Sequence, residues 1–393
     1  MHLIVYILGV LLLCVLPDVL LWYKAIKQKL KPLLYVQIIT NVLFVLSIIG
    51  MVVGMKYATH MMPVLIFGTV FFAIYIPKWL YLPFGMFNKH RIGMVLAAVG
   101  FMLVMYGLCI GRTEMQQRTI VINSPQIPQA FDGYKIVQLS DLHLGSLLKD
   151  EYWVRQLPQA INNLEPDLVV FTGDLVNCYA DETIGWEELF KQLEARDGKW
   201  ACKGNHDYSH YNKWRNDIDS LQNTLAVNDA FKKLGFQLLN DSAAVIKKGQ
   251  DSIFICGVEN ISRPPFGSHG SVSKAMQSVP DSVVAIMLSH DPIAWQDSIR
   301  QHKNVLLTLS GHTHAMQMGI DCWGIHLSPA SIMHPYWDGT YQQDGQYLHV
   351  NRGLGYVGFP MRIGMKPEIT LIELKVLLKL SLVRNRSAVV TSH

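Results

Sequence analysis

Apolar residues along this 393-residue chain gather in two different patterns, long runs at the start and short runs afterwards. The first 112 residues hold four apolar stretches, each near the ~20 residues that span a bilayer as a helix. They are Leu3–Tyr23, Leu33–Met55, Met62–Phe84 and Ile92–Ile110. A cleaved signal peptide would account for one stretch, and no small-residue cleavage site follows the first. We therefore expect a bundle of four transmembrane helices over residues 1–112.

The rest of the chain alternates short apolar runs with helical segments, the pattern of an α/β domain. Residues 113–130, with two prolines and a short β-like piece, are expected to form a strand and a linker. The globular domain is expected over residues 131–375. Residues 376–393 form a C-terminal tail that fits either a short amphipathic helix or a frayed end.

Basic residues are unevenly distributed around the apolar stretches. The first connection, residues 24–31, carries four lysines, and the third carries Lys78, Lys89 and Arg91, whereas the second has only Lys56. By the positive-inside rule, the first and third connections face the cytoplasm. Four spans then place the globular domain on the outer side of the cytoplasmic (inner) membrane.

Composition narrows the class of protein further. At 50% hydrophobic and 16% charged residues, the chain is too apolar for an ordinary soluble protein, and the excess lies in the first 112 residues. The net charge of +4, without a basic stripe or reading motif, gives no reason to expect nucleic-acid binding. Cys14 and Cys109 fall in predicted spans, and the other four cysteines show no metal-binding spacing. Cys178 and Cys202 could lie close together if the domain is extracytoplasmic, but buried free thiols are expected.

Polar residues follow five of the short apolar runs directly. Asp141 and His143 come after the run at 134–139 and, two residues apart, would lie on one face of a strand. In open α/β sheets, ligands bind beyond the carboxyl ends of the strands. The expected donors at such ends are Asp141, His143, Asp174, Asn205, His290, His312 and His314.

Oxygen and imidazole donors without a cysteine suit divalent Mn, Fe or Zn better than a structural thiolate zinc site. Seven donors are too many for one ion, but two ions that share a bridging carboxylate satisfy the count. Asp174, in the middle of the order, is the best bridge because both of its oxygens can bind. Two metals about 3.5–4 Å apart can activate a hydroxide for in-line phosphoryl displacement. The pattern therefore predicts hydrolysis of a phosphate ester.

Five short motifs in order resemble those of the calcineurin-like metallophosphoesterase family. They are SDLHLG at 140–145, GD at 173–174, GNHD at 204–207, SHDP at 289–292 and GHTH at 311–314. The closing NRGLG at 351–355 and PEITLIEL at 367–374 are most similar to its bacterial membrane-attached branch. The resemblance covers about residues 115–375 and implies a four-layer αββα sandwich, two packed sheets flanked by helices, with two metals at the strand ends.

Residue roles follow from the resemblance position by position. It implies that one metal is bound by Asp141, His143, Asp174 and His314, and the other by Asp174, Asn205, His290 and His312. His206 is implied to be the acid that protonates the leaving group or steadies the phosphate, oriented by Asp207, with Asn205 also against the substrate. Ala315 and Met316 stand where the branch usually has two glycines before Gln317, which changes the bulk beside His314.

Arg352, in the NRGLG motif, has two interpretations. It could bind a substrate phosphate bidentately, or it could form a structural ion pair. The sequence leaves both open.

Two classes of function compete. One is a membrane-anchored phosphoesterase that acts on lipid, cell-wall or nucleotide-type phosphates; some similar proteins cleave the pyrophosphate of a UDP-diacylglucosamine, which would need a cytoplasmic domain. The other is a membrane sensor or transporter with a regulatory phosphoesterase-like domain. Such a protein would tolerate loss of ligands or of His206, and all are present, so the enzyme is favoured. The oligomeric state stays open.

Overall fold

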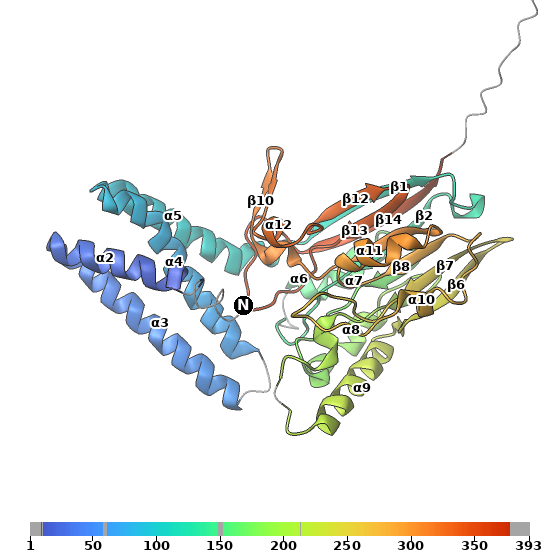
Figure 1. Ribbon diagram of the computed structural model, residues 1–393, viewed down its shortest axis with the longest axis horizontal. Coiled ribbons are helices and arrows are strands. Elements are labelled where there is room, and N and C mark those ends of the chain that lie inside the picture. The colour runs from blue at the N-terminus through green and yellow to red at the C-terminus, as the bar shows by residue number, and fades with distance from the viewer. Residues whose placement is uncertain (1–8, 10, 58–60, 148–151, 213, 378–393) are drawn as a thin grey trace, which may run out of the picture.

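The computed structural model describes residues 9, 11–57, 61–147, 152–212 and 214–377. Long apolar helices lie at one end of the molecule and a mixed α/β part lies at the other (Figure 1). The predicted mixed α/β fold after an apolar helical region is confirmed.

The apolar end consists of four α-helices with short π-helical turns at each extreme. These elements are η1 (Leu11–Val15), α2 (Leu16–Lys27), α3 (Lys31–Tyr57), α4 (Met62–Met86), α5 (His90–Tyr106) and η2 (Gly107–Gly111). Among the described residues, three stretches are long and apolar enough to cross a membrane, namely Lys31–Met55, Met62–Met86 and His90–Gly111. They match three of the four expected spans. The remaining one, Leu3–Tyr23, begins outside the described residues and continues as η1 and α2.

A charged pair explains how α4 carries a lysine within an apolar span. The helix continues through Pro77 and Lys78, and the Lys78 ammonium lies 2.5 Å from the Asp18 carboxylate of α2. Asn41 of α3 accepts a second hydrogen bond from Lys78 at 2.7 Å. Because an unpaired charge is expensive in hydrocarbon, such residues in membrane helices pair with one another. Together with Asn41, the Asp18–Lys78 pair joins α2, α3 and α4.

The first sheet has six strands in the order β1-β14-β2-β3-β4-β5. Its strands are β1 (Gln116–Ser124), β2 (Tyr134–Leu139), β3 (Leu168–Phe171), β4 (Lys199–Ala201), β5 (Gln237–Leu238) and β14 (Glu368–Val376). Strands β2 to β5 are parallel, and β14 runs antiparallel to β2 and parallel to β1. The strand expected within residues 113–130 is β1, which lies at the edge of the first sheet beside β14. Of the expected tail, residues 378–393 lie outside the described residues.

The second sheet also has six strands, in the order β12-β13-β9-β8-β7-β6. Its strands are β6 (Ser242–Lys248), β7 (Asp251–Gly257), β8 (Ala285–Leu288), β9 (Val305–Ser310), β12 (Gly339–Gln343) and β13 (Gln346–Val350). A separate hairpin of β10 (Ile320–Cys322) and β11 (Ile325–Leu327) stands apart from both sheets.

Alternate residues of the central strands point to opposite faces, and both faces are covered. In β2, Ile136 packs between the two sheets, whereas Val137 packs under the helices on the outer face of the first sheet. In β8, Ile286 points inward and Met287 points to the helices outside the second sheet. Burial on both faces is why these strands read as continuous apolar runs.

The remaining helices are short, apart from α9. The α-helices are α6 (Tyr152–Arg155), α7 (Leu157–Asn162), α8 (Glu187–Lys191), α9 (Asp217–Lys233), α10 (Val272–Ala275), α11 (Ile293–Asp297) and α12 (Ala330–Met333). The 3-10 turns are η3 (Gln129–Phe131), η4 (Ala180–Thr183), η5 (Asn205–Tyr208), η6 (Ile299–Gln301) and η7 (His314–Gln317).

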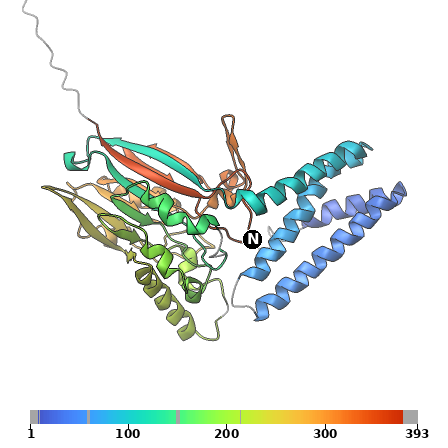
Figure 2. The ribbon, with the colours of Figure 1, turned by 180° about the vertical axis from the view of Figure 1, so that it is seen from behind.

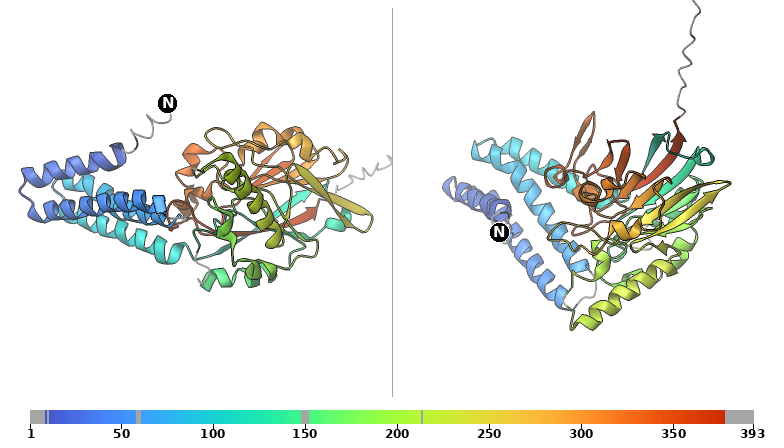
Figure 3. Two further views of the ribbon diagram at one scale, coloured as in Figure 1. Left: turned by 90° about the horizontal axis from the view of Figure 1, so that it is seen from below. Right: turned by 45° about the vertical axis from the view of Figure 1, so that its right-hand side comes forward.

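The apolar helices pack directly against the α/β part (Figures 2 and 3). Leu65 of α4 is part of the core formed under the first sheet. A Cβ atom at Gly68 would collide with the Gly358 carbonyl, and the rings of Phe72 and Phe359 lie 4.5 Å apart. The two parts are therefore joined by side-chain packing as well as by the chain.

A buried ion cluster connects the two sheets. Arg352, after β13, donates from Nε to Asp338 at 2.9 Å and from Nη2 to Asp338 at 2.6 Å and Asp321 at 2.5 Å. Glu368 of β14 lies 3.8 Å away in the first sheet, and the Arg352 side chain is 1% exposed. The geometry is that of a structural ion pair, the second of the two interpretations open from the sequence.

We predict that Arg352→Met lowers the stability of the fold. Removal of one partner from a buried ion cluster leaves uncompensated carboxylates, which costs about 3 kcal/mol or more. The apparent midpoint of thermal unfolding of the full chain in detergent should fall clearly. Arg263→Met is the matched control, because the Arg263 guanidinium pairs with Asp297 on the surface and is 60% exposed. Equal unfolding midpoints for the two variants would contradict a stabilising role of Arg352 in the ion cluster.

Candidate active site

Five strand ends from the two sheets meet at one place. Asp141 and His143 follow β2, Asp174 follows β3, and Asn205 follows β4 in the first sheet. In the second sheet, His290 follows β8, and His312 and His314 follow β9. The structure thus brings together all seven donors that the sequence singled out, through the contacts described below.

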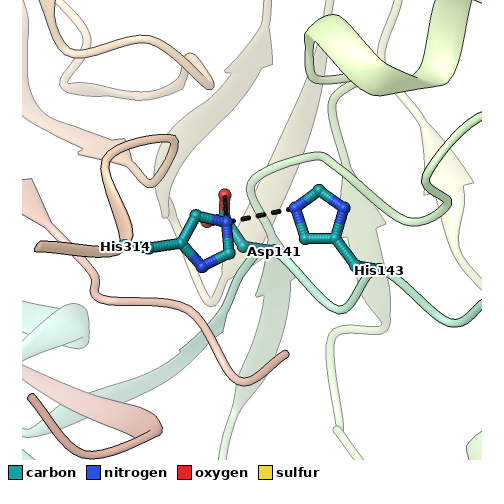
Figure 4. A group of neighbouring side chains, drawn as sticks. All are labelled: Asp141, His143 and His314. Atoms are coloured by element: carbon teal, nitrogen blue, oxygen red, sulfur yellow. Dashed lines mark hydrogen bonds and ion pairs between the residues drawn. The ribbon is translucent and has the colours of Figure 1, made fainter. Parts of the chain in front are cut away.

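The first group of donors is Asp141, His143 and His314 (Figure 4). The His314 Nε2 atom lies 3.2 Å from the Asp141 Oδ1 atom and 3.1 Å from the His143 Nε2 atom. One potential ligand atom from each residue lies within 4.8 Å of the others, and all three side chains are buried. These atoms are spaced as ligands around a single ion would be.

Asp174 lies between this group and a second one. Its Oδ2 atom is 3.6 Å from the His143 Nε2 atom and 3.1 Å from the His290 Nε2 atom. Asp174, His290 and His312 form the second group of potential ligands. Asn205 joins them because its Oδ1 atom lies 2.8 Å from the His312 Nδ1 atom. Asp174 thus occupies the position that a bridging carboxylate requires.

Hydrogen bonding around His290 fits a metal ligand. Its Nδ1–H donates to the Thr172 carbonyl at 2.7 Å, so the Nε2 atom faces Asp174 and is the atom that could bind a metal ion. In the described structure, Nε2 is buried without a hydrogen-bond partner. A ring nitrogen and a carboxylate in this arrangement need a cation between them, either a proton on Nε2 or a metal ion in its place. The donors therefore fit divalent metal ions.

The electrostatics of the site lead to the same conclusion. Burial opposes ionisation of Asp174, yet His290 and His206 keep the pKa of that carboxyl well below its ordinary value. Burial lowers the pKa of His290, but Asp174 outweighs it and raises that pKa to about 10. Burial lowers the pKa of His312 to about 4. Asp174 is therefore ionised and favours a cation beside it, whereas the His312 ring is neutral and free to bind one.

Five of the seven donors have a left-handed backbone, which is uncommon for residues other than glycine. The φ angles are 51° for Asp141, 46° for His143, 57° for Asp174, 76° for His312 and 49° for His314. Such conformations cost of order 1 kcal/mol each and persist where the surrounding structure fixes them, often at functional sites. The strained backbone at these strand ends therefore fits a site in which the positions of the side chains matter for function.

Ala315 and Met316, which stand where the membrane-attached branch usually has two glycines, adopt an uncommon backbone conformation. Both residues have a left-handed backbone, with φ angles of 48° and 46°. Glycine adopts this conformation without steric cost, which accounts for the two glycines usual at these positions in the branch that the sequence resembles. Ala315 is buried beside His314, whereas the Met316 side chain is exposed.

His206 is held from two sides. Its Nδ1–H donates to the Asn177 carbonyl at 2.7 Å, and its ring stacks on Tyr211 with centroids 4.1 Å apart. Tyr211 also accepts a hydrogen bond from the Asn205 amide at 2.7 Å. His206 lies close enough to His143 and Asp174 to form a third group of potential ligands. The sequence had given Tyr211 no role, because no motif includes it.

The predicted role of Asp207 in orienting the His206 ring is wrong, because the Asn177 carbonyl occupies that position. The Asp207 carboxylate instead accepts four backbone N–H groups from two loops of the site. They belong to Gly204, Asp174 and Leu175, at 2.9 Å each, and Val176, at 3.3 Å. Asp207 therefore fixes the loop that carries Asp174.

Arg362 is a further residue that the sequence did not reveal. Its buried guanidinium lies 3.3 Å from the His314 Nδ1 atom and donates to the carbonyls of Gly355 at 2.6 Å and Gly353 at 3.1 Å. It lies between the NRGLG and PEITLIEL motifs but belongs to neither, and most of its partners are backbone atoms, which leave no signal in a sequence. Arg352, the arginine that was singled out, lies in the ion cluster described above.

A cavity of about 250 Å³ opens next to the second group of donors. Phe266 and His334 line it, and their rings meet the His312 ring at centroid distances of 4.9 and 5.9 Å. Asp291, which follows His290, lines it as well. Two of the rings that line the cavity therefore lie against His312, although His312 itself is not part of the lining.

Comparisons with known proteins agree with this geometry. The calcineurin-like phosphoesterase family matches residues 134–316. A Bacillus subtilis protein described as an uncharacterized metallophosphoesterase, YkuE, is 31% identical over 296 residues, which cover 74% of this chain and 95% of that protein. A Danio rerio transmembrane protein with metallophosphoesterase domain is 29% identical over 302 residues, which cover 74% of this chain but only 64% of that protein.

The name of a third relative states an enzymatic activity. The UDP-2,3-diacylglucosamine pyrophosphatase LpxG of Chlamydia trachomatis is 27% identical over 301 residues, which cover 64% of this chain and 86% of that protein. With its motifs, its converging strand ends and these relatives, the chain belongs to the metallophosphoesterase family and contains a calcineurin-like phosphoesterase domain.

Proposed function

We propose that this protein is a membrane-anchored phosphoesterase that hydrolyses phosphate esters with two divalent metal ions. The observation that carries the proposal is the Asp174 carboxylate, which lies between two groups of buried donors. A membrane sensor or transporter with a regulatory domain is the alternative. An intact set of donors together with His206 favours the enzyme.

The proposed ligands divide as the resemblance implied. One ion would be held by Asp141, His143, Asp174 and His314, and the other by Asp174, Asn205, His290 and His312. Two divalent ions in these positions would polarise a phosphate ester and supply the hydroxide that attacks it. Manganese, iron and zinc all suit this donor set.

His206 is the proposed general acid. Because its Nδ1–H is engaged by the Asn177 carbonyl, its Nε2 atom is the one available to donate a proton to the leaving oxygen or to steady a phosphate oxygen. Asn205 is also proposed to contact the substrate. Asp207 acts as a positioning residue through the backbone of Asp174, and we propose a structural role for Arg352.

The proposed substrates are phosphate esters at a membrane face, of the lipid, cell-wall or nucleotide type. The name of the Chlamydia relative, a UDP-2,3-diacylglucosamine pyrophosphatase, supports a substrate that carries acyl chains. We propose a helical region over residues 1–112 with four spans, and a catalytic domain that extends over residues 116–376 to include β1. The excess of basic residues in the first and third connections supports a cytoplasmic membrane with the domain outside.

We predict that Asp174→Asn lowers the bound metal below two ions per chain and abolishes phosphate-ester hydrolysis. The amide has no charge to share between two cations and only one oxygen to bind them. Metal content by elemental analysis and turnover of a nitrophenyl phosphate ester are the measurements. Asp297→Asn, at the surface pair with Arg263, is the control and should match the unaltered chain. Full metal content with full activity in Asp174→Asn would refute the dinuclear assignment.

His206→Ala is expected to keep its metal content while turnover falls by roughly 10² or more. The loss should be smallest for esters whose leaving group needs no proton, such as nitrophenyl esters, and larger for alkyl esters. His302→Ala is the control and should match the unaltered chain, because His302 lies outside the groups of potential ligands and the hydrogen bonds given for it involve only its backbone. Equal losses on both ester types would argue against an acid, and loss of metal would make His206 a ligand.

Topology is tested with reporter fusions after residues 28, 58, 88 and 120. Four spans with the domain outside predict active alkaline phosphatase after 58 and 120 and fluorescent protein after 28 and 88. A fluorescent reporter and inactive phosphatase at 120 would place the domain in the cytoplasm.

A further inference from the structure

We propose that the β10–β11 hairpin lies on the bilayer surface and holds the mouth of the active site at the lipid headgroups. The proposal goes beyond the phosphoesterase activity, because it concerns a membrane-contacting surface outside the spanning helices. The contacting surface, called the apolar hairpin face below, consists of Ile320, Cys322, Trp323, Ile325 and Leu327.

Strand pairing gives this hairpin two unlike faces. Ile320 pairs with Leu327 and Cys322 with Ile325, whereas Asp321 pairs with His326. Directly paired residues lie on the same side of a two-stranded ribbon, and neighbours in sequence lie on opposite sides. One face is therefore apolar throughout and the other carries the acid and the imidazole.

The polar face is turned toward the protein. Asp321 accepts a hydrogen bond from Arg352 at 2.5 Å, and the His326 Nε2 atom lies 3.0 Å from the Asp338 carboxylate. The His326 ring also stacks on Trp337 with centroids 4.4 Å apart. These contacts fix the orientation of the hairpin, so the apolar face points away from the α/β part.

The apolar hairpin face is exposed. Trp323, at the tip, is 94% exposed, and all four strand residues of this face are also exposed. Helix α12 continues the surface with Ile332, which is 87% exposed, and Met333. Soluble proteins rarely leave so large an apolar patch uncovered. From Cys322 to Met333 the sequence has no Asp, Glu, Lys or Arg, so a charged protein partner would find nothing to pair with.

The base of the hairpin is attached to the end of the last membrane helix. The Gly319 N–H donates to the Ile363 carbonyl at 2.8 Å, and the Arg362 N–H donates to the Gly107 carbonyl of η2 at 3.2 Å. In Figures 1 and 3 the hairpin projects beside the end of α5 and η2. It therefore begins at the level at which the chain leaves the bilayer, where tryptophan side chains are enriched.

A second apolar patch lies at the opposite edge of the same side of the molecule. Ile218, Leu221 and Leu225 form a stripe along α9, and all three are exposed. Figures 1 and 3 show the beginning of α9 beside the ends of α3 and α4. Two exposed apolar patches that flank the spanning helices would both be covered by one flat bilayer. A second copy of the chain seated on one patch would leave the other uncovered.

The surface leads directly to the candidate active site. Met333 of α12 and the adjacent His334 line the cavity beside His312. Contact of the apolar hairpin face with the bilayer would therefore bring that cavity to the lipid headgroups, where a phosphate ester carried by a lipid is located.

The test uses the full chain in phosphatidylcholine vesicles, with a nitroxide spin label on the single exposed cysteine of each variant, while the four buried cysteines are kept. Exposed Cys109 and Cys322 are first replaced by serine, and the label is placed with Trp323→Cys or Leu221→Cys. Val245→Cys, on exposed β6 at the end of the molecule away from the helices, is the matched control. Collision rates with oxygen, which concentrates in lipid, and with a water-soluble nickel chelate are then compared.

The proposal predicts a several-fold higher ratio of oxygen to nickel collisions at 323 and 221 than at 245, and a drop in that ratio at 323 when the chain is in detergent-free amphipol. Equal ratios at 323 and 245 would overturn it. A short dipolar distance between labels at 323 on two chains would also overturn it in favour of a second copy. Neither readout requires turnover, so failure of the phosphoesterase proposal would leave this result interpretable.

Discussion

The carboxylate of Asp174 is a buried anion, and the structure around it is arranged so that it can stay ionised. A buried charge persists only when it is paired and hydrogen-bonded. His290 and His143 face Oδ2, and the His206 backbone N–H donates to Oδ1 at 2.9 Å. The Asp207 carboxylate holds the backbone on which Asp174 sits. Convergence of strand ends from both sheets follows from this one requirement, since no single loop could supply so many partners.

The sequence was sufficient to predict the parts of the fold that depend on local pattern. Apolar length predicted three of the described spans, and the runs that end in Asp141, Asp174 and His312 predicted strands with donors at their carboxyl ends. Contacts between segments that are far apart along the chain could not be predicted from the sequence. The pairing of β1 with β14 joins segments about 250 residues apart along the chain. The carbonyl partner of His206 could not be predicted either, because any residue can provide a backbone oxygen.

The membrane helices and the candidate active site share one segment, residues 356–366. Arg362 in that segment contacts the His314 ring through its side chain and the Gly107 carbonyl of η2 through its backbone. The Gln317 side chain, three residues after His314, donates to the Phe359 carbonyl at 2.9 Å, and Phe359 packs on Phe72 of α4. A shift of either helix would therefore displace a proposed metal ligand. This packing explains why the apolar helices belong to the architecture of the site and do more than tether it.

A dinuclear centre bridged by Asp174 has a spectroscopic property that can be measured. Two manganese ions that share a carboxylate are exchange-coupled, whereas isolated ions are not. Titration of the metal-stripped full chain with Mn(II), followed by electron paramagnetic resonance, should show a multiline signal of a coupled pair that grows to two equivalents per chain. A six-line signal of isolated manganese that saturates at one equivalent would contradict the two-metal site on which the account depends.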